Sequence, residues 1–269
     1  MNDSKPLAVV TGASSGIGLE LARQLAERGY DLIINAEDDA RLEDAARRIR
    51  AEGAEVETVR ADLRDYEEAE RFYAAVTATG RPPAVVALNA GVGRGGAFLD
   101  ADLADQLEIV DLNVRSTVHL ANRVLRDMAA RDEGRLLVTS SIASTQPGSF
   151  QSVYNASKSF LQSFAQALQN ELKDTGVTIT SLMPGPTETD FFHRADMDDT
   201  RVGTMSKDDP AQVARQGLDA LFAGKEKIVA GSAMTKAQGL AGKVLPDKLK
   251  AEAHRRMAEP GSGESGGAG

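Results

Sequence analysis

One glycine-rich stretch near the start of the chain constrains the fold more than any other feature. Residues 11–18 read Thr-Gly-Ala-Ser-Ser-Gly-Ile-Gly, and they lie between an apolar run at 7–10 and a helix-patterned segment that begins at Leu19. A buried strand therefore runs into a tight turn and then a helix. Glycine suits such a turn because a Cβ would block the close approach of a charged ligand to the backbone. The helix N-terminus supplies free N–H groups and the positive end of its dipole, which suits a pyrophosphate.

The glycine spacing differs from the usual dinucleotide fingerprint. The stretch reads G-x-x-x-G-x-G, whereas the fingerprint is G-x-G-x-x-G. A glycine-rich strand-to-helix turn without any ligand is the alternative for this stretch alone. Other parts of the chain must decide between the two.

Apolar runs alternate with helical patterns along most of the 269 residues. The helical patterns include long ones at 103–128 and about 153–174, and a proline at 210 opens another. Strand candidates occupy residues 7–10, 32–34, 56–60, 85–88, 135–139, 177–182 and 227–230. This alternation predicts an α/β fold, a doubly wound parallel sheet of about seven strands with helices on both faces. Ligands of such sheets lie at the carboxyl ends of the strands.

Composition excludes several classes of function. The net charge of -9 argues against non-specific nucleic-acid binding, which needs a basic surface. The chain has no cysteine, so disulfides, thiolate metal sites and cysteine nucleophiles are excluded together. We expect a reducing, cytoplasmic location. The first residues lack the pattern of a secretory signal, and no run approaches the roughly 20 apolar residues of a membrane span, so no membrane partner is expected.

The pattern weakens after Ser232. The segment 236–256 is basic and partly amphipathic, which fits either binding to a membrane surface or a solvated helix or subunit contact. We favour the second interpretation. Residues 261–269 are mostly glycine and serine and predict a disordered tail, which leaves residues 1–260 as a single domain.

A tyrosine and a lysine four residues apart are the strongest candidates for chemistry. Tyr154 and Lys158 share one face of a predicted helix. A phenol titrates near pH 10, so it needs a neighbouring positive charge to exchange a proton near neutrality. Ser141 follows the fifth predicted strand, where its hydroxyl could hold a carbonyl oxygen. Taken alone, these residues also fit an ordinary helix surface and strand end.

Together these motifs resemble the short-chain dehydrogenase/reductase (SDR) family, over residues 7 to about 230. Residues 11–18 match the family's T-G-x-x-x-G-x-G signature, and Asn89-Ala90-Gly91 match its N-A-G motif. Asn113 lies where the family has an asparagine in the long helix, and Ser141, Tyr154 and Lys158 match the family's serine and its Y-x-x-x-K pair. Pro184-Gly185 with Thr189 match its P-G-x-x-x-T motif. The resemblance implies a Rossmann-type fold and a nicotinamide-dependent oxidoreductase that interconverts a carbonyl and a secondary alcohol. It also implies a homo-oligomer, either a tetramer or a dimer.

The resemblance assigns roles to individual residues. Tyr154 is the general acid in reduction and the general base in oxidation, and Ser141 binds the reacting oxygen. Lys158 holds the nicotinamide ribose and lowers the tyrosine pKa, while Asn113 fixes a water that links Lys158 to solvent. The implied cofactor-binding residues are Gly12, Ser14, Ser15, Gly16, Ile17, Gly18, Glu37, Asp62, Leu63, Asn89, Ala90, Gly91, Tyr154, Lys158, Pro184, Gly185, Thr187 and Thr189. Asp62 would accept from the adenine amino group, and Thr189 would bind the carboxamide.

The residues after the second predicted strand indicate which of the two cofactors, NAD or NADP, the chain prefers. NADP-preferring family members commonly carry arginine where this chain has Glu37, and NAD-preferring members often carry aspartate where it has Ala36. Glu37 could accept from a ribose 2′-OH and would repel a 2′-phosphate, so we expect NAD(H) to be favoured over NADP(H). The alternative is that Glu37 points to solvent while Asp38 caps the next helix.

Three loops, at 91–98, 144–150 and 186–205, should surround the substrate. The last contains Phe191 and Phe192, which fit either a mobile lid over a hydrophobic ketone or alcohol, or the packing of a helix onto the body. His193 has no second histidine at metal-ligand spacing, so no metal site is expected.

Two other functions fit the same fold. A dinucleotide-sensing protein without turnover has no need of the set Asn113, Ser141, Tyr154 and Lys158. Epimerisation or dehydration of a nucleotide sugar would usually demand a larger C-terminal domain than the forty or so residues after the last strand. The sequence therefore favours the oxidoreductase.

Overall fold

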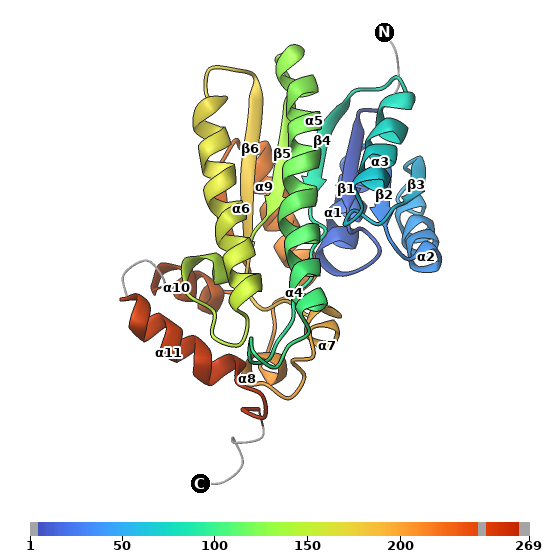
Figure 1. Cartoon of the computed structure of the whole chain (residues 1–269). Helices are drawn as coiled ribbons and strands as arrows, with labels where there is room; N and C mark the ends of the chain where they lie inside the picture. Colours follow the sequence, from blue (N-terminus) through green and yellow to red (C-terminus); the bar gives the residue numbers. More distant parts are fainter. Residues whose placement is uncertain (1–4, 242–245, 264–269) are drawn as a thin grey trace.

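The computed structural model describes residues 5–241 and 246–263, and its centre is one parallel sheet. The sheet has seven strands in the order β3-β2-β1-β4-β5-β6-β7, and all pairings are parallel (Figure 1). The strands are β1 (Leu7–Thr11), β2 (Asp31–Ala36), β3 (Val56–Arg60), β4 (Pro83–Leu88), β5 (Gly134–Thr139), β6 (Val177–Pro184) and β7 (Lys227–Ala230). The predicted doubly wound sheet is confirmed.

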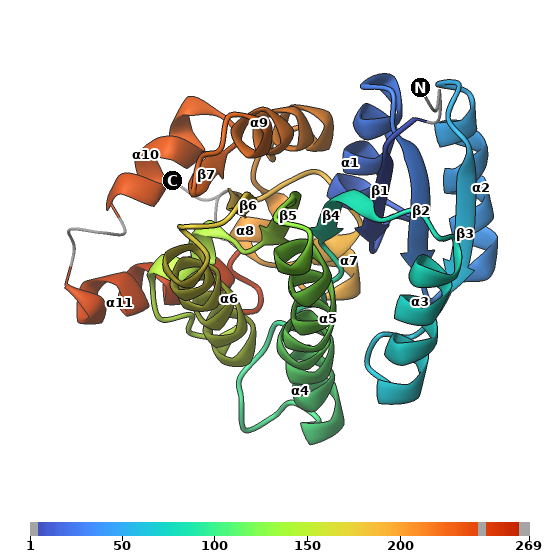
Figure 2. The same ribbon diagram turned by 90° about the horizontal axis from the view of Figure 1, so that it is seen from above.

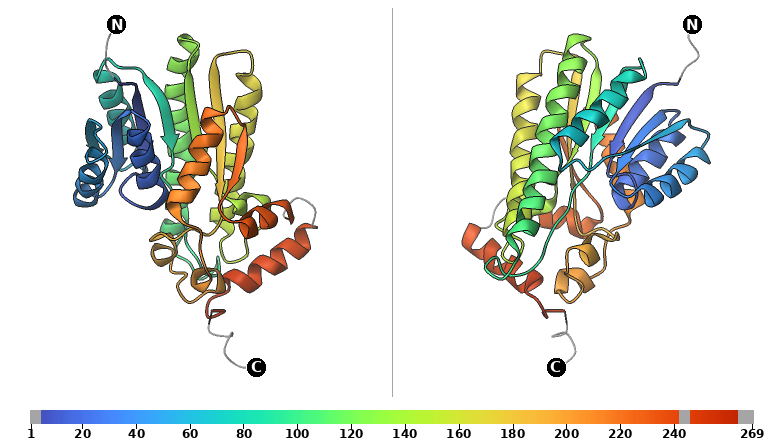
Figure 3. Two further views of the ribbon diagram at one scale, coloured as in Figure 1. Left: turned by 180° about the vertical axis from the view of Figure 1, so that it is seen from behind. Right: turned by 45° about the vertical axis from the view of Figure 1, so that its right-hand side comes forward.

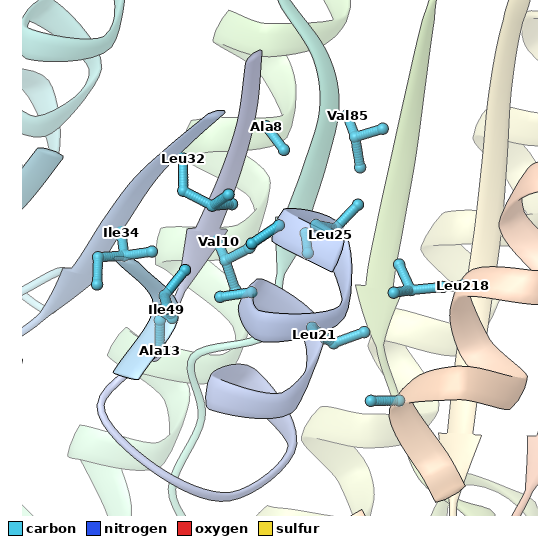
Figure 4. Close-up of a cluster of buried hydrophobic side chains, with 14 of the residues drawn as sticks. Ala8, Val10, Ala13, Leu21, Leu25, Leu32, Ile34, Ile49, Val85 and Leu218 are labelled. Carbon is cyan, nitrogen blue, oxygen red and sulfur yellow. The ribbon is translucent and has the colours of Figure 1, made fainter. Parts of the chain in front are cut away.

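Helices cover both faces of the sheet (Figure 2). One face carries α1 (Gly16–Glu27), α2 (Asp39–Arg50) and α9 (Pro210–Phe222), and the other carries α3 (Tyr66–Ala78), α5 (Ser116–Ala130) and α6 (Ser152–Glu171). Successive side chains of β1 alternate between the two cores, so Val10 packs with Leu21 and Leu25 of α1 (Figure 4) while Val9 packs on the opposite face. Because both faces are covered, the strand is a continuous apolar run.

The strand order reverses between β1 and β4. The chain therefore leaves the carboxyl ends of these two strands toward opposite faces of the sheet, and sheets of this type form a ligand crevice at that place. Four short helices gather at the same end of the sheet (Figures 1 and 3): α7 (Phe191–Arg194), α8 (Arg201–Thr204), α10 (Ala233–Ala241) and α11 (Asp247–Ala258). The fold thus collects segments from the whole chain around one edge.

The predicted long helix at 103–128 is not regular. It comprises α4 (Leu103–Ile109), a π-helical segment at Val110–Arg115, and then α5. Asn113 lies in the π-helical segment and is fully buried. Segments of this kind are rare and occur frequently at functional sites.

The predicted disordered tail does not hold for residues 261–263. The N–H of Gly261 donates to Asp199 Oδ2 at 2.8 Å, and the N–H of Gly263 donates to the Asp199 carbonyl at 2.9 Å. The rest of the tail, 264–269, and the start of the chain, 1–4, lie outside the described residues. Among the helices that are described, none combines the length and the apolar character needed to cross a membrane.

Candidate active site

The turn after β1 leaves the N-terminus of α1 open toward a cleft. Within the described residues, the N-cap Ser15 makes no side-chain capping bond and the first turn of α1 has no acidic residue. The first N–H groups of the helix are thus left for a ligand. An added Cβ on Gly18 would lie 2.1 Å from the carbonyl oxygen of Gly12, so the tight packing of the turn requires glycine there. This geometry fits a pyrophosphate.

Asn89 joins three strand ends beside this turn. Its Nδ2 donates to the Thr11 carbonyl at 3.2 Å, its N–H donates to Thr11 Oγ1 at 3.0 Å, and its Oδ1 accepts from Thr139 Oγ1 at 3.1 Å. These bonds fix the ends of β1, β4 and β5 relative to one another.

Tyr154 lies in the first turn of α6 and Ser141 lies just after β5. The Ser141 Oγ accepts from the Ala143 N–H at 3.0 Å, which fixes the hydroxyl. Burial raises the pKa of Tyr154 to about 12, while a hydrogen bond with Ser141 acts in the opposite direction. The Tyr154 ring packs against Phe191, with 5.2 Å between the ring centroids. The phenol is therefore held in an apolar setting next to one hydroxyl.

Lys158 lies one helical turn further along α6. Its side chain is 4% exposed, and its Nζ donates to the Thr139 carbonyl at 3.0 Å and lies 5.8 Å from the centroid of the Tyr154 ring. Burial lowers the pKa of Lys158 to about 8. In this structure burial sets the direction of the Tyr154 pKa, and the hydrogen bond with Ser141 is the contribution that lowers it. The lowering by Lys158 that the family resemblance implies stays a prediction.

Asn113 is buried behind these residues. Its Oδ1 accepts from the Val92 N–H at 2.9 Å, and its Nδ2 donates to the Val92 carbonyl at 2.9 Å and to Ser157 Oγ at 3.0 Å. The amide therefore positions the chain after β4 beside α6. An added Cβ on Gly91 would lie 3.1 Å from Asn113 Oδ1 and 3.2 Å from Lys158 Nζ, so the three residues are close neighbours.

An arginine that the sequence prediction missed organises the far end of the cleft. Arg64 pairs with Glu37 at 2.6 Å, with Asp62 at 2.8 Å and with Glu108 at 3.3 Å. Burial acts to raise the pKa of Asp62, but the hydrogen bonds from Arg64 outweigh it and hold that pKa below its usual range. Asp38 does cap α2, accepting from the Arg41 N–H at 3.0 Å. Glu37 nevertheless lines the cleft.

The segment after β6 crosses to the glycine turn. An added Cβ on Gly16 would lie 2.7 Å from Thr189 Cγ2, which shows how closely the two segments pack. Thr187 is buried and forms an isolated parallel bridge with Asp208. The predicted closing segment therefore lies over the N-terminus of α1.

One cleft brings the predicted residues together. All the predicted cofactor residues line it, and so does Ser141, whereas Asn113 lies behind the wall. Phe191 and Phe192 both line it, and Phe192 also packs with Ala195 and Met197. Across the described parts of the chain, no group of three histidine or acidic side chains could hold a metal ion.

The expectation of a solvated helix within 236–256 is wrong for one face of α11, while a subunit contact stays a prediction. Lys250 and His254 are 9% and 8% exposed and line the cleft together with Met257. Their spacing of four and three residues places them on one helical face, which was the available signal. The basic residues that suggested a solvated helix are Lys243, Lys248, Lys250, Arg255 and Arg256. Lys248, Arg255 and Arg256 are exposed, Lys250 is buried, and Lys243 lies outside the described residues.

Comparison with known proteins identifies the family. Residues 6–200 match the family model described as short chain dehydrogenase. The chain therefore belongs to the short-chain dehydrogenase/reductase family of oxidoreductases, as its sequence motifs predicted.

Individual relatives agree with this assignment. The chain is 32% identical over 216 residues to an uncharacterised oxidoreductase of Staphylococcus saprophyticus, covering 80% of this chain and 90% of that protein. It is 35% identical over 193 residues to the putative ketoacyl reductase of the monensin polyketide synthase of Streptomyces virginiae, covering 70% and 73%.

Solved structures give the same result. A short-chain dehydrogenase from Sphingobium yanoikuyae in complex with NADPH matches with a TM-score of 0.78 and 27% identity, over 83% of this chain and 87% of that one. An SDR protein from Burkholderia phymatum in complex with NAD matches with a TM-score of 0.82 and 25% identity, over 97% and 99%.

Proposed function

We propose that this protein interconverts a ketone or aldehyde and the corresponding alcohol by hydride transfer, with Tyr154 as general acid or base. The observation that carries the proposal is the meeting of Ser141, Tyr154 and Lys158 in the cleft into which the N-terminus of α1 opens. A bound nicotinamide dinucleotide supplies or accepts the hydride at the carbon. Tyr154 Oη supplies or accepts the proton at the oxygen, so the two together balance the reaction.

Ser141 orients the reacting oxygen in this proposal. Its Oγ accepts from the Ala143 N–H, and the hydroxyl itself makes only a long, 3.5 Å bond to the Pro184 carbonyl, so a reacting oxygen or Tyr154 at a shorter distance can accept from it instead. Lys158 places a positive charge beyond the tyrosine ring, which favours the phenolate that forms when the proton leaves. The N–H groups at the start of α1 and the ammonium of Lys158 are the donor set for the dinucleotide.

We propose that NAD(H) is preferred over NADP(H). Glu37 lines the cleft at the carboxyl end of β2, where its carboxylate can accept from a ribose 2′-OH and repel a 2′-phosphate. Its ion pair with Arg64 holds the carboxylate in place. The two related structures were solved with NADPH and with NAD, so the family members themselves take either cofactor.

We also propose a homo-oligomer, a dimer or a tetramer. Large apolar side chains are exposed along α4, the π-helical segment, α5 and α6, namely Leu103, Leu107, Val110, Val118 and Phe160. Covering such a face with a second copy removes its apolar surface from water. Sedimentation analysis measures the mass of the assembly, which tells a dimer or tetramer from a single chain.

The test of the proposed reaction is turnover with NADH and NADPH in parallel against a panel of ketones and aldehydes. Tyr154→Phe keeps the ring and its contact with Phe191 but removes the proton, so turnover should fall at least ~1,000-fold while NADH affinity stays within about threefold. Tyr30→Phe, on the opposite side of the sheet beside Phe222, is the matched control and should retain full activity. Comparable turnover by Tyr154→Phe and wild type would contradict the proposal.

A further inference from the structure

The helix α11 closes the end of the cleft next to Tyr154, and several bonds hold it there. Lys250 Nζ donates to the Thr145 carbonyl at 3.1 Å, and Ser149 Oγ donates to the Ala251 carbonyl at 3.2 Å. His254 Nδ1 lies 3.0 Å from the Ser149 carbonyl. These partners lie in the segment between β5 and α6, and Tyr154 is only five residues beyond Ser149. The helix therefore forms a fixed wall on the side of the reacting group.

The hydrogen bond to Ser149 determines the state of His254. A carbonyl oxygen only accepts, so Nδ1 carries the ring proton. Burial lowers the pKa of His254 below its ordinary value of 6.5, which keeps the ring neutral at physiological pH. Nε2 is then an acceptor. The histidine is 8% exposed, it lines the cleft, and no hydrogen bond within the described residues uses Nε2.

The surroundings of His254 are mostly apolar. Lining side chains at this end include Phe191, Phe192, Val202, Ala253 and Met257, with the neutral amides Gln146 and Gln151. The two acidic residues that line the cleft, Glu37 and Asp62, lie at the opposite end with Arg64. Lys250 already bonds Thr145 and pairs with Asp247 at 2.7 Å. Within the described residues the compartment is thus mostly apolar, and its polar groups include the His254 ring, the two amides, Lys250 and the exposed Arg194.

We infer that the substrate is an apolar carbonyl compound or alcohol that carries a hydroxyl group at the end remote from the reacting carbon, and that this hydroxyl donates to Nε2 of His254. The inference rests on the proposed function, because it places the reacting carbon at Tyr154. Nε2 is not among the described buried atoms that lack a partner, so it is open to the cleft. A substrate that fills the cleft buries it, and an acceptor buried without a donor is costly, so a site of this kind rejects an analogue that lacks the donor more strongly than one that differs in apolar size.

Matched probes separate the effect of a hydrogen-bond donor on binding affinity from the effects of size and polarity. They are 4-phenylbutan-2-one, its three hydroxyphenyl isomers, and the corresponding methoxyphenyl compounds, which accept but do not donate. Dissociation constants are measured by calorimetry with the oxidised cofactor bound, so that no ketone turns over. At least one hydroxyphenyl isomer should bind tenfold or more tightly than its methoxy partner and than the parent. If none does, or if no probe binds, the inference is overturned.

Two substitutions then assign the effect to Nε2. In His254→Asn the amide nitrogen can still donate to the Ser149 carbonyl, but nothing replaces Nε2, so the tenfold preference should fall to within about threefold. In His254→Gln the longer amide can reach the Nε2 position, and part of the preference should return. Met257→Leu, on the same face, should change the affinity for all probes alike. A preference that His254→Asn leaves intact overturns the inference.

Failure of the proposed function would look different. A hydroxyl preference that depends on His254, in a protein that binds the dinucleotide but shows no Tyr154-dependent turnover on the probes or the wider panel, would overturn the proposed reaction alone. Turnover that depends on Tyr154 without any hydroxyl preference would overturn this inference alone.

Discussion

The two ends of the cleft are built in different ways. The dinucleotide end, made by residues 12–18, 35–37, 61–63 and 89–91, comes from short segments that each follow a strand end. The α11 end, made by residues 142–151, 191–202 and 250–258, comes from segments that lie up to about a hundred residues apart and meet through bonds such as that of Lys250 to Thr145. Contacts between backbone segments hold the first end together, while contacts between side chains and distant segments hold the second end together.

This difference separates what the fold requires from what a substrate requires. At the dinucleotide end even one added methyl group meets the main chain, so few sequences can build it. At the α11 end a change such as His254→Asn alters the lining while the sheet and the turn remain. Changes at the glycine turn of the first end should therefore weaken binding of any dinucleotide, and changes at the second end should alter only the choice of substrate.

The largest effect is expected for Gly18→Ala. The new Cβ would lie 2.1 Å from the Gly12 carbonyl and 2.5 Å from Asn89 Nδ2, so the turn must shift. We expect NADH affinity to fall at least ~100-fold and the free energy of unfolding to fall by roughly 3 kcal/mol. Calorimetric titration measures the NADH affinity, and urea denaturation measures the free energy of unfolding.

The control is Gly53→Ala, at φ +83° with no atom within 4 Å of the new Cβ. It should lower the free energy of unfolding by about 1 kcal/mol and leave the NADH affinity unchanged. If Gly18→Ala binds NADH as tightly as the wild type, the glycine turn is not the part of the cleft on which dinucleotide binding depends.

A smaller effect is expected at Glu37. Glu37→Arg removes the carboxylate that would repel a 2′-phosphate and adds a group that can pair with one, so the ratio of kcat/KM for NADH over NADPH should fall by about 30-fold. Steady-state kinetics with a panel ketone measure the ratio. Glu108→Gln removes another carboxylate from Arg64 but lies outside the cleft lining, so the ratio should not change. An unchanged ratio in Glu37→Arg would exclude Glu37 as the residue that selects the cofactor.

The smaller of the two changes in stability concerns Lys158, whose buried charge disfavours folding. Burial moves its pKa from 10.5 to about 8, which corresponds to roughly 3 kcal/mol against folding at pH 7. Removing it also leaves the Thr139 carbonyl without its donor, at a cost of about 1 kcal/mol. Lys158→Met should therefore raise the free energy of unfolding by about 2 kcal/mol at pH 7 while turnover is lost.

The stability gained by Lys158→Met should depend on pH. The folded-state pKa lies below the unfolded value, so the penalty is fully present below about pH 8 and fades as the pH rises toward 10.5. Urea denaturation should show the advantage of Lys158→Met reduced by more than half at pH 9.5. Lys227→Met, an exposed lysine on β7, should be neutral at both values. A Lys158→Met protein less stable than wild type at pH 7 would show that the buried cation is not a cost.

The same contrast explains what the sequence could predict. The dinucleotide end was predictable because its signals are local: an apolar run, then glycines at fixed spacing, then a helical pattern. All seven strands were placed close to their observed bounds for the same reason. Tyr154 and Lys158 were predictable as a pair because helical spacing alone puts them on one face.

The missed features depend on contacts between distant segments. Nothing in the spacing of apolar residues marks the π-helical segment around Asn113, since one extra residue in a turn leaves the pattern nearly unchanged. Arg64 was overlooked because its three carboxylate partners come together only in the folded chain. The role of α11 was misjudged because its exposed arginines dominate the composition, whereas His254 becomes a cleft residue only through its bond to Ser149.

The proposed reaction moves a hydride to a carbonyl carbon in this cleft while Tyr154 provides the proton. The most direct test uses NADH and NADPH deuterated separately on each face of the nicotinamide C4, with the panel ketones, and mass analysis of the alcohol. We expect one deuterium on the carbinol carbon from one face only, and loss of this transfer in Tyr154→Phe. Tight dinucleotide binding without deuterium transfer from either face to any panel member would contradict it.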